Sequence, residues 1–462
     1  MERTSRRLFP AQRRPAGWAL FLLSLILILP CMTLPTAAVE PEAPPQSADV
    51  GVVLLINLEN NITLYEKEAD TNIYPSSSVK IMAGLLLCRA LEGRLEEEVT
   101  ITSAMLSGVE GRKMIPPLAV GEKLKVKDIL YAAVTGGYND ATHVAAILAA
   151  DSVAAFVEQM NTEALRLGTA HTRYTNPTGI HDPKMCTTAR DLSIIAREAY
   201  GNKLFMKLTS ERVYTLPATN IAGERTFTNR NSLISDSSQN YFNGYCRGMN
   251  AGMTDEGGWC VVTVCERGGA SNLCIVMRGK DVASGELIPA YVYTNRLLSW
   301  SNRAYANTAV LLAGDTLETR KVAMTGVSKS KAALTVKEDL KVYLPQNADP
   351  ETDLVYDVHL TGDGLTAPLS AGDVVGQVVV TYNGSVVGKA DLTVTEDFST
   401  SIFLLGLMGF KDYLMSRPFI ITVIIFILLL LLYIRIVKGP GGRYDSRVVN
   451  RRRVKLVKRR YR

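Results

Sequence analysis

An uncharged apolar run near the carboxyl end sets the layout of the whole chain. The 17 residues from Pro418 to Ile434, PFIITVIIFILLLLLYI, carry no charge, which is the length of a short membrane-spanning helix. From Arg435 onward, twelve Lys and Arg residues stand against one acidic residue. Because basic segments stay on the cytoplasmic side, we expect one transmembrane helix over 418–437, a cytoplasmic tail over 438–462, and everything before the helix outside the cell.

The amino-terminal end is typical of a secretory signal over residues 1–38. Five arginines precede the apolar run WALFLLSLILILP, and TLPTAA supplies small residues for cleavage. An uncleaved anchor is the alternative. The chain as a whole has a net charge of +6, the segment from Arg435 has +11 and the first 38 residues have +4, which leaves −9 for the exported part. The basic total is therefore no sign of nucleic-acid binding, and we expect the tail to contact the membrane and its anionic lipids.

The cysteines and histidines predict neither a disulfide framework nor a metal site. Cys31 lies in the signal, and the other six cysteines follow no framework spacing, so we interpret them as buried thiols. The four histidines are scattered, and the chain has no C-x-x-C or H-E-x-x-H motif. We therefore expect no metal and no cofactor. The six cysteines are Cys88, Cys186, Cys246, Cys260, Cys265 and Cys274.

The exported part begins, after a Pro-rich linker over 39–48, with a domain of mixed α and β segments. Residues 50–67 form two strand-like runs around the turn-prone ENN, and helical patterns occupy much of 78–200. Two more strand-like runs lie within 257–279. These alternations predict an α+β domain over 49–305 whose first and last strands share one sheet. The apolar run after Lys80 is too continuous for an amphipathic helix, so we expect that helix to be buried.

Residues 315–396 predict a small all-β domain of short alternating strands. Asn383 and Gly384 form a two-residue hairpin turn inside it. Residues 400–417 follow, and we interpret them as an amphipathic segment at the membrane surface, with a last packed helix of the β domain as the alternative.

The stretch YPSSSVK, Tyr74 to Lys80, raises the question of a serine nucleophile. A hydroxyl needs a base within hydrogen-bonding reach, and only Ser77 stands three residues before Lys80, on the same face of a helix. Burial beside IMAGLLL favours the neutral amine that a base requires. Ser76 or Ser78 would cap the helix, with Pro75 just outside it. The alternative is a capped helix start with a solvated lysine.

In its context this motif resembles the D-alanyl-D-alanine carboxypeptidases, the low-molecular-weight penicillin-binding proteins. The blocks ITLYEKEADTNIYPSSSVKIM, AVGEKLKVKDILYAAVTGGYNDATHVAAILA and GMNAGMTDEGGWCVVTV are similar to the family's three motif regions, and the β domain with its anchor matches the family's usual ending. The stretches around 167–198 and 226–234 also resemble the family, without an assigned role. The resemblance implies a DD-peptidase/β-lactamase-like domain that acts on peptidoglycan stem peptides and takes β-lactams.

It also implies which residues form the site. By resemblance, the N–H groups of Ser77 and Met253 would hold the oxyanion. The resemblance gives Ser77, Lys80 and Asn139 as catalytic residues and Asn250, Gly252, Met253 and Thr254 as substrate-binding residues.

The second and third motifs depart from the family pattern. Where the family has S-x-N, this chain has Gly137-Tyr138-Asn139, and where the family has K-T-G it has Asn250-Ala251-Gly252. Loss of a positioned proton-transfer group slows a reaction by about 10²–10⁴-fold. Loss of the lysine removes a charge-assisted bond to a carboxylate, worth about 1.5–3 kcal/mol. Arg247 stands three residues before Asn250, so on a regular strand it faces the other side, and only a bulge would bring it round.

Three hypotheses follow. The first is a working peptidase in which Ser77 attacks the D-Ala–D-Ala carbonyl, Lys80 takes its proton and water hydrolyses the acyl-enzyme. The second is a catalytically lapsed relative that serves as a binding or scaffold protein at the cell wall. The third is an altered substrate, such as a peptide without a free carboxylate.

Overall fold

The computed structural model describes residues 43–235, 240–326 and 329–438. The chain divides into two compact units, one made of residues up to 308 together with 342–354, the other of 309–341 together with 355 onward. The expected signal at 1–38 and the tail from 439 lie outside the described residues.

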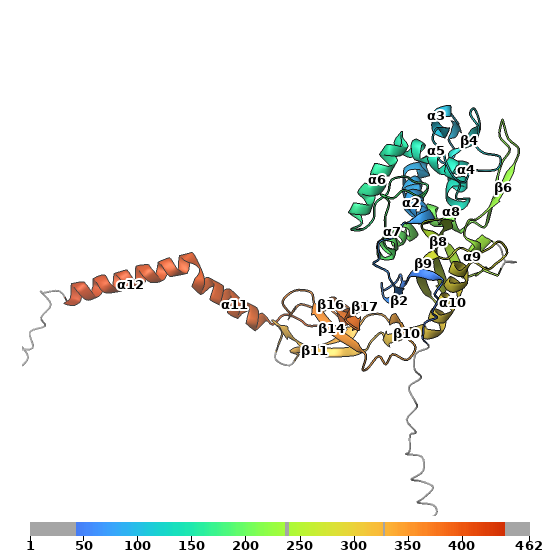
Figure 1. Cartoon of the computed structure of the whole chain (residues 1–462). Helices are drawn as coiled ribbons and strands as arrows, with labels where there is room; N and C mark the ends of the chain where they lie inside the picture. The colour runs from blue at the N-terminus through green and yellow to red at the C-terminus, as the bar shows by residue number, and fades with distance from the viewer. Residues whose placement is uncertain (1–42, 236–239, 327–328, 439–462) are drawn as a thin grey trace, which may run out of the picture. The chain divides into compact units, whose positions relative to one another are not determined.

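The first unit is built on a five-stranded antiparallel sheet in the order β2-β1-β9-β8-β7. The expected hairpin in 50–67 is confirmed, and the first and last strands of the domain do share this sheet (Figure 1). The strands are β1 (Val50–Asn57), β2 (Thr63–Lys67), β7 (Cys246–Thr254), β8 (Gly258–Arg267) and β9 (Ala270–Gly279).

Alternate residues of β1 enter two different hydrophobic clusters, as the period of two along a strand requires. Val52 and Leu54 pack with the helical region that includes α2, whereas Val53 and Leu55 pack with helix α10 (Pro289–Ala304) on the other face. The sheet is therefore covered on both sides, and its strands are apolar on both faces.

Helix α2 (Val79–Leu91) is the buried centre of the helical region, as its composition predicts. Ile81, Met82 and Leu85 have no exposed surface. Gly84 allows a close approach to helix α8, because a Cβ there would lie 2.8 Å from the ring of Phe205. The residues just ahead of α2 are thereby anchored to the middle of the domain.

The helical pattern expected within 78–200 is interrupted near its middle, between residues 130 and 139. Helix α4 (Val126–Leu130) runs into a π-helical turn, Tyr131–Thr135, and α5 (Asn139–Ala150) starts afresh after Gly137, whose φ of +65° is left-handed. This conformation suits glycine and ends the first segment. The remaining elements are α3 (Ser103–Leu106), α6 (Val153–Arg166), α7 (Ala189–Tyr200), α8 (Lys203–Ser210), α9 (Ser232–Ser235) and the strand pairs β3 (Glu98–Thr100) with β4 (Lys123–Lys125) and β5 (Val213–Leu216) with β6 (Arg225–Thr228).

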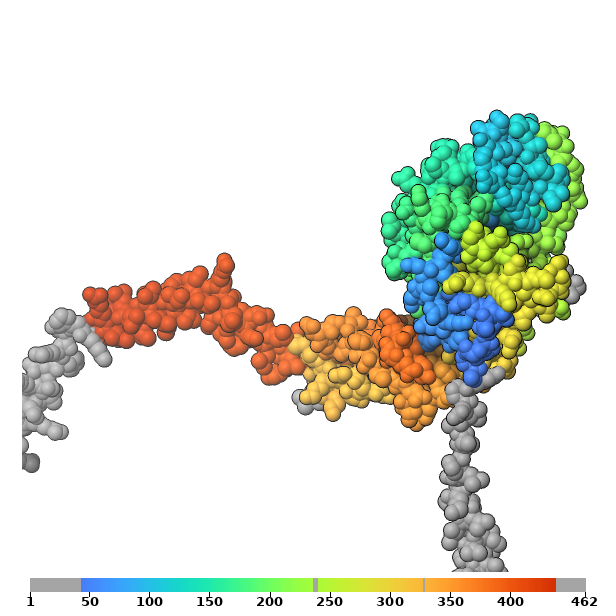
Figure 2. All heavy atoms as spheres, in the orientation of Figure 1, coloured from blue at the N-terminus to red at the C-terminus, as the bar shows by residue number. Residues whose placement is uncertain are grey.

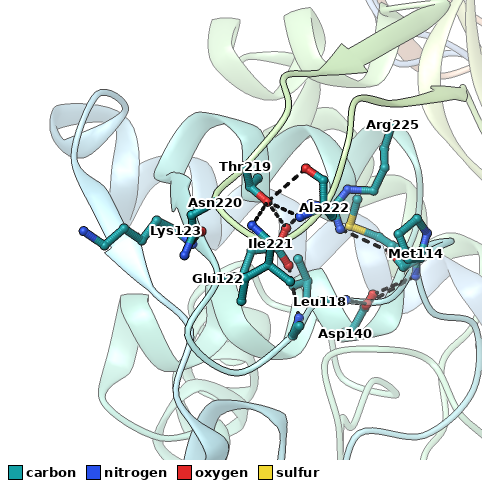
Figure 3. Close-up of polar contacts among 12 residues, drawn as sticks. Met114, Leu118, Glu122, Lys123, Asp140, Thr219, Asn220, Ile221, Ala222 and Arg225 are labelled. Carbon is teal, nitrogen blue, oxygen red and sulfur yellow. Dashed lines mark hydrogen bonds and ion pairs between the residues drawn. The ribbon is translucent and has the colours of Figure 1, made fainter.

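A buried ion pair ties the β5–β6 hairpin to the loop between α3 and β4 (Figure 3). The carboxylate of Glu122 has no exposed surface and accepts bonds from the Arg225 guanidinium, the Thr219 hydroxyl at 2.8 Å and the Ala119 N–H at 3.1 Å. Arg225 also donates to the Pro116 carbonyl at 3.2 Å. The loop over 110–122 is thus held from several sides.

Removal of one partner from this pair should destabilise the first unit strongly. Glu122→Ala leaves a buried guanidinium without its counter-charge, which costs about 3–5 kcal/mol, so the melting temperature in a calorimetric scan should fall by several degrees. Glu96→Gln is the matched control, because Glu96 pairs with Lys125 and Lys127 at the surface and such pairs contribute little. Equal melting temperatures for the two variants would contradict this assignment.

The second unit contains a six-stranded sheet in the order β14-β16-β17-β12-β11-β15. Tyr382 pairs with Ser385 across the predicted turn, in which Asn383 and Gly384 both have positive φ, so the hairpin is confirmed. The strands of this sheet are β11 (Thr316–Ala323), β12 (Lys331–Val336), β14 (Leu354–Leu360), β15 (Leu365–Thr366), β16 (Val374–Tyr382) and β17 (Ser385–Val394). A separate two-stranded sheet, which does not belong to one unit alone, pairs β10 (Tyr305–Leu311) with β13 (Leu340–Pro345).

Two exposed apolar helices complete this unit. Helix α12 (Arg417–Lys438) is the one single helix among the described residues that is long and apolar enough to span a membrane, over 417–437. Helix α11 (Ile402–Met415) precedes it and buries none of its side chains, and on the face shown in Figure 2 no other element covers either helix. Phe403 and Phe410 of α11 are 74% and 60% exposed. Its apolar residues therefore have no packing partner in the described β domain.

Candidate active site

A cleft of about 360 Å³ in the first unit brings all seven predicted site residues together. The helical side contributes Ser77, Lys80 and Asn139, which come from the start of α2 and the start of α5. The sheet side contributes the end of strand β7. The residues of that strand in the cleft are Asn250, Ala251, Gly252, Met253 and Thr254.

Ser77 lies in a 3₁₀ turn, Ser76–Ser78, directly ahead of α2. Its Oγ is buried and has no hydrogen-bond partner among the described residues. An unpartnered buried hydroxyl is costly unless something else uses it. The predicted caps are wrong in detail: neither Ser76 nor Ser78 makes a side-chain cap bond, because Ser76 Oγ donates to the Gly258 carbonyl and Ser78 Oγ donates to the Pro75 carbonyl.

The Lys80 amine is held by two carbonyl oxygens. Its Nζ donates to Asn139 Oδ1 at 2.9 Å and to the carbonyl of Thr178. The pKa of Lys80 is lowered to about 7, chiefly by desolvation and in addition by the positive charges of Arg230 and Arg112. A neutral amine has two hydrogens, and both are occupied here, so the lone pair is the group that remains free to accept a proton.

Asn139 connects this amine to the loop above it. Its side-chain nitrogen donates to the Glu110 carbonyl at 3.0 Å, and its backbone N–H donates to the Arg112 carbonyl at 2.6 Å. Gly111 lies close by, and a Cβ there would come within 2.4 Å of Asn139 Nδ2. The orientation of Asn139 is thereby fixed, with Oδ1 directed to Lys80.

Two glycines clear the space around the serine. A Cβ on Gly252 would lie 2.8 Å from Ser77 Cβ and 2.9 Å from its Oγ. A Cβ on Gly179 would lie 2.4 Å from the Ser76 carbonyl oxygen. Strand β7 and the 176–181 turn therefore approach the nucleophile turn as closely as backbones can.

Strand β7 does carry the bulge that Arg247 would need. The register with β8 shifts between Arg247 and Asn250. Arg247 is nevertheless engaged outside the cleft, where it donates to the carbonyls of Gly244 and Cys246 and lies 3.6 Å from the carboxylate of Glu266. Asn250 Oδ1 is buried without a hydrogen-bond partner among the described residues. No cation of this strand replaces the lysine.

The structure adds two arginines and a carbonyl that the sequence interpretation missed. Arg112 and Arg230 line the cleft, and the Thr178 carbonyl binds Lys80. Arg230 and Thr178 fall in the two stretches that resemble the family without an assigned role, so the resemblance marked their neighbourhoods. Arg112 lies in an irregular loop whose pattern carries no signal.

The six cysteines among the described residues are free thiols, and all but Cys186 are buried, which agrees with their interpretation as buried thiols. Burial raises the pKa of the Cys260 thiol to about 12.

The family model described as D-alanyl-D-alanine carboxypeptidase matches residues 37–281, and the model described as the C-terminal domain of penicillin-binding protein 5 matches residues 305–400. The carboxypeptidase DacF of Bacillus subtilis is 25% identical, with 76% of this chain and 86% of DacF covered. DacA of Haemophilus influenzae is 27% identical, with 77% and 86% covered. Penicillin-binding protein 5 from Haemophilus influenzae matches in structure with a TM-score of 0.59 at 25% identity, over 77% of this chain and 99% of that one.

An antiparallel sheet and a helical region that enclose a serine and a lysine one helical turn apart define a DD-peptidase fold. The chain belongs to the D-alanyl-D-alanine carboxypeptidase family of low-molecular-weight penicillin-binding proteins.

The clearance at Gly252 gives a direct test of the cleft geometry. Gly252→Ala places a methyl group against Ser77 Cβ and Oγ and forces the side chain aside, so the rate of covalent labelling by a fluorescent β-lactam should fall about a hundredfold. Gly93→Ala is the control, because a Cβ there meets nothing within 4 Å. Equal labelling rates in both variants would show that Ser77 does not react in this position.

Proposed function

We propose that this chain is a membrane-anchored serine D-Ala–D-Ala carboxypeptidase that acts on peptidoglycan stem peptides through an acyl-enzyme on Ser77. The observation that carries this proposal is the arrangement of Lys80: a cleft lysine with a pKa of about 7, both of whose amine hydrogens have acceptors, one helical turn after a serine with an unpartnered Oγ.

In the acylation step, Ser77 Oγ attacks the carbonyl of the penultimate residue, and its proton passes to the Lys80 lone pair. The backbone N–H groups of Ser77 and Met253 stabilise the oxyanion, as the family resemblance implies. The amine of the last residue then departs and takes a proton. Water hydrolyses the ester that remains on Ser77, which frees the shortened peptide.

Protonation of the departing amine is the step most affected by the altered motifs, because the serine of the second motif is absent. Gly137 offers no hydroxyl there, so the proton must come from Lys80 directly or through water. Turnover should therefore be slower than in a relative with the full motif, by up to the 10²–10⁴-fold that positioned proton transfer supplies. The catalytically lapsed binding protein is the second candidate, and the same loss at Gly137 and Asn250 favours it.

One labelling experiment separates these candidates. The purified protein is incubated with a fluorescent β-lactam, and release of D-Ala from a stem pentapeptide is followed in parallel. We expect covalent label on the wild-type protein, none on Ser77→Ala, and slow D-Ala release. No label at high reagent concentration would overturn the acyl-enzyme, whereas label without D-Ala release would support the lapsed relative.

The pH dependence of acylation should follow the ionisation of Lys80. Because the neutral amine is the base and the pKa is about 7, the labelling rate should rise about tenfold per pH unit below pH 7 and level off above it. Lys80→Arg should lose labelling at every pH, since a guanidinium stays protonated. Arg230→Gln should move the midpoint upward, because it removes a charge that lowers the pKa of Lys80. A labelling rate that stays the same from pH 5 to pH 9 would contradict the role of Lys80 as the base.

The anchor has a proposed topology as well. We place the enzyme domain outside a bacterial membrane, α12 across it, the basic tail inside and α11 at the outer surface, because the exposed apolar side chains of α11 need a lipid environment. An epitope fused after Arg462 should stay protected when protease is added to intact spheroplasts. Digestion of the epitope without lysis would reverse this orientation.

A further inference from the structure

We propose that Cys246 and Cys265 form an oxidation site, at which a disulfide donor cross-links the start of strand β7 to strand β8. The product is a disulfide within the chain, on the strand that carries the cleft residues Asn250 to Thr254. The chemistry of the pair does not depend on turnover at Ser77. Its occurrence in the cell rests on the proposed position of this unit outside the membrane, where disulfides form and persist.

The two cysteines face each other across an antiparallel strand pair. Cys246 and Cys265 are Cα partners in the register of β7 with β8, and both belong to the same buried cluster. The Cys246 N–H donates to the Asn243 carbonyl at 2.9 Å. The Glu266 N–H donates to the Tyr245 carbonyl at 2.9 Å, one residue beyond the pair on each strand. The cysteines therefore occupy a non-hydrogen-bonded pair, the closer of the two antiparallel kinds.

Such a pair has the dimensions that a disulfide requires. Opposed Cα atoms at a non-hydrogen-bonded pair lie about 4.5 Å apart, and disulfides bridge Cα separations of about 4.4–6.8 Å. The thiols already contact each other, because the Cys246 S–H donates a hydrogen bond to Cys265 Sγ. Formation of the S–S bond therefore needs a rotation of the side chains rather than a movement of the strands.

The third thiol of this cluster, Cys274, is less well placed. It lies on β9, opposite Thr263 of β8 and Leu55 of β1. Strand β8 separates it from Cys246, and it is diagonal to Cys265, whose direct partner on β9 is Asn272. Diagonal Cα atoms lie about 7–8 Å apart, beyond what a disulfide bridges without backbone movement. The geometry thus selects one pair out of three buried thiols.

The surroundings activate Cys265 rather than Cys246. The hydrogen bond from Cys246 lowers the pKa of the Cys265 thiol, and the charges of Arg267 and Arg247 lower it as well, while burial opposes them. The same hydrogen bond, together with burial, raises the pKa of Cys246. Because the thiolate is the nucleophile in disulfide exchange, Cys265 is the thiol that attacks the donor.

The exchange balances with a disulfide donor such as glutathione disulfide. Cys265 Sγ attacks one sulfur of the donor, the S–S bond of the donor breaks, and the first donor thiol departs. Cys246 Sγ then attacks Cys265 Sγ in the mixed disulfide, and the second donor thiol departs. The two cysteines lose two electrons, the donor gains them, and the two cysteine protons pass to the released thiols.

The pair lies close to the surface although both side chains are buried. Cys246 is the first residue of β7, which is an edge strand, and the preceding Tyr245 is 48% exposed. Glu266, which follows Cys265, is exposed as well. Because the ends of elements open at a small fraction of the free energy of global unfolding, a small donor reaches the pair while the domain stays folded.

The cross-link holds β7 on the side of its bulge that is away from the cleft. The register shift lies between Arg247 and Asn250, and the cleft residues follow it. Neither cysteine lines the cleft. A disulfide here restricts the unfolded chain and fixes the start of an edge strand, so oxidation stabilises the sheet wall of the cleft without a change in its chemistry.

The test uses the full-length protein in detergent, purified from cells that exported it and treated with either glutathione disulfide or dithiothreitol. Digestion without reduction, followed by mass spectrometry, should find the Cys246 peptide joined to the Cys265 peptide after glutathione disulfide and separate from it after dithiothreitol. The oxidised protein should melt roughly 5–10 °C above the reduced protein.

Three single variants complete the test. Cys246→Ala and Cys265→Ala should each abolish both the linked peptide and the difference in melting temperature between the two treatments. Cys274→Ala is the matched control and should keep both, because Cys274 is as deeply buried in the same cluster.

Two results would overturn the site. One is complete alkylation of Cys246 and Cys265 after treatment with glutathione disulfide and denaturation, and the other is a link to Cys246 that survives in Cys265→Ala. If the linked peptide forms but the wild-type protein takes no β-lactam label, the acyl-enzyme proposal fails and the oxidation site stands.

Discussion

The hydrogen bonds of the Lys80 amine to Asn139 Oδ1 and to the Thr178 carbonyl are the interaction on which the site depends. They join three separate parts of the chain: the buried helix α2, the start of α5 and the turn at 176–181. Each part is fixed by its own contacts. In the turn, for example, Asn176 Oδ1 accepts hydrogen bonds from the Thr178 N–H, the Thr178 hydroxyl and the Gly179 N–H. The amine is positioned because its two acceptors are themselves held by these contacts.

The two altered motifs lie beside two arginines of the cleft. Because Gly137 and Asn250 replace a serine and a lysine, the cleft lacks a hydroxyl in its second motif and a cation in its third. Arg112 and Arg230, which line the same cleft, carry positive charge there. The same charges help keep Lys80 neutral, because they lower its pKa beyond the effect of desolvation. The two arginines therefore act together with burial to lower the pKa of Lys80.

Much of the fold could be predicted from the sequence, because the strand-like apolar runs within 50–67 and 257–279 and the continuous apolar run after Lys80 reflect burial directly. The break at Gly137 was missed, since one left-handed glycine interrupts a helical pattern without altering its composition. The predicted capping role of Ser76 and Ser78 was also wrong, because both residues lie in a 3₁₀ turn in which their hydroxyls donate hydrogen bonds to backbone carbonyls. Arg112 could not be found, since its position comes from tertiary contacts of an irregular loop.

For Ser77 to react, Lys80 must be a neutral amine at the pH where the enzyme works. The most direct measurement is the titration of the Lys80 ε-carbon by NMR in protein labelled with ¹³C at that position, assigned by its loss in Lys80→Arg. We expect a midpoint near 7, well below the ordinary value of 10.5. A midpoint near 10.5 would show that Lys80 stays charged and would contradict its role as the base for Ser77.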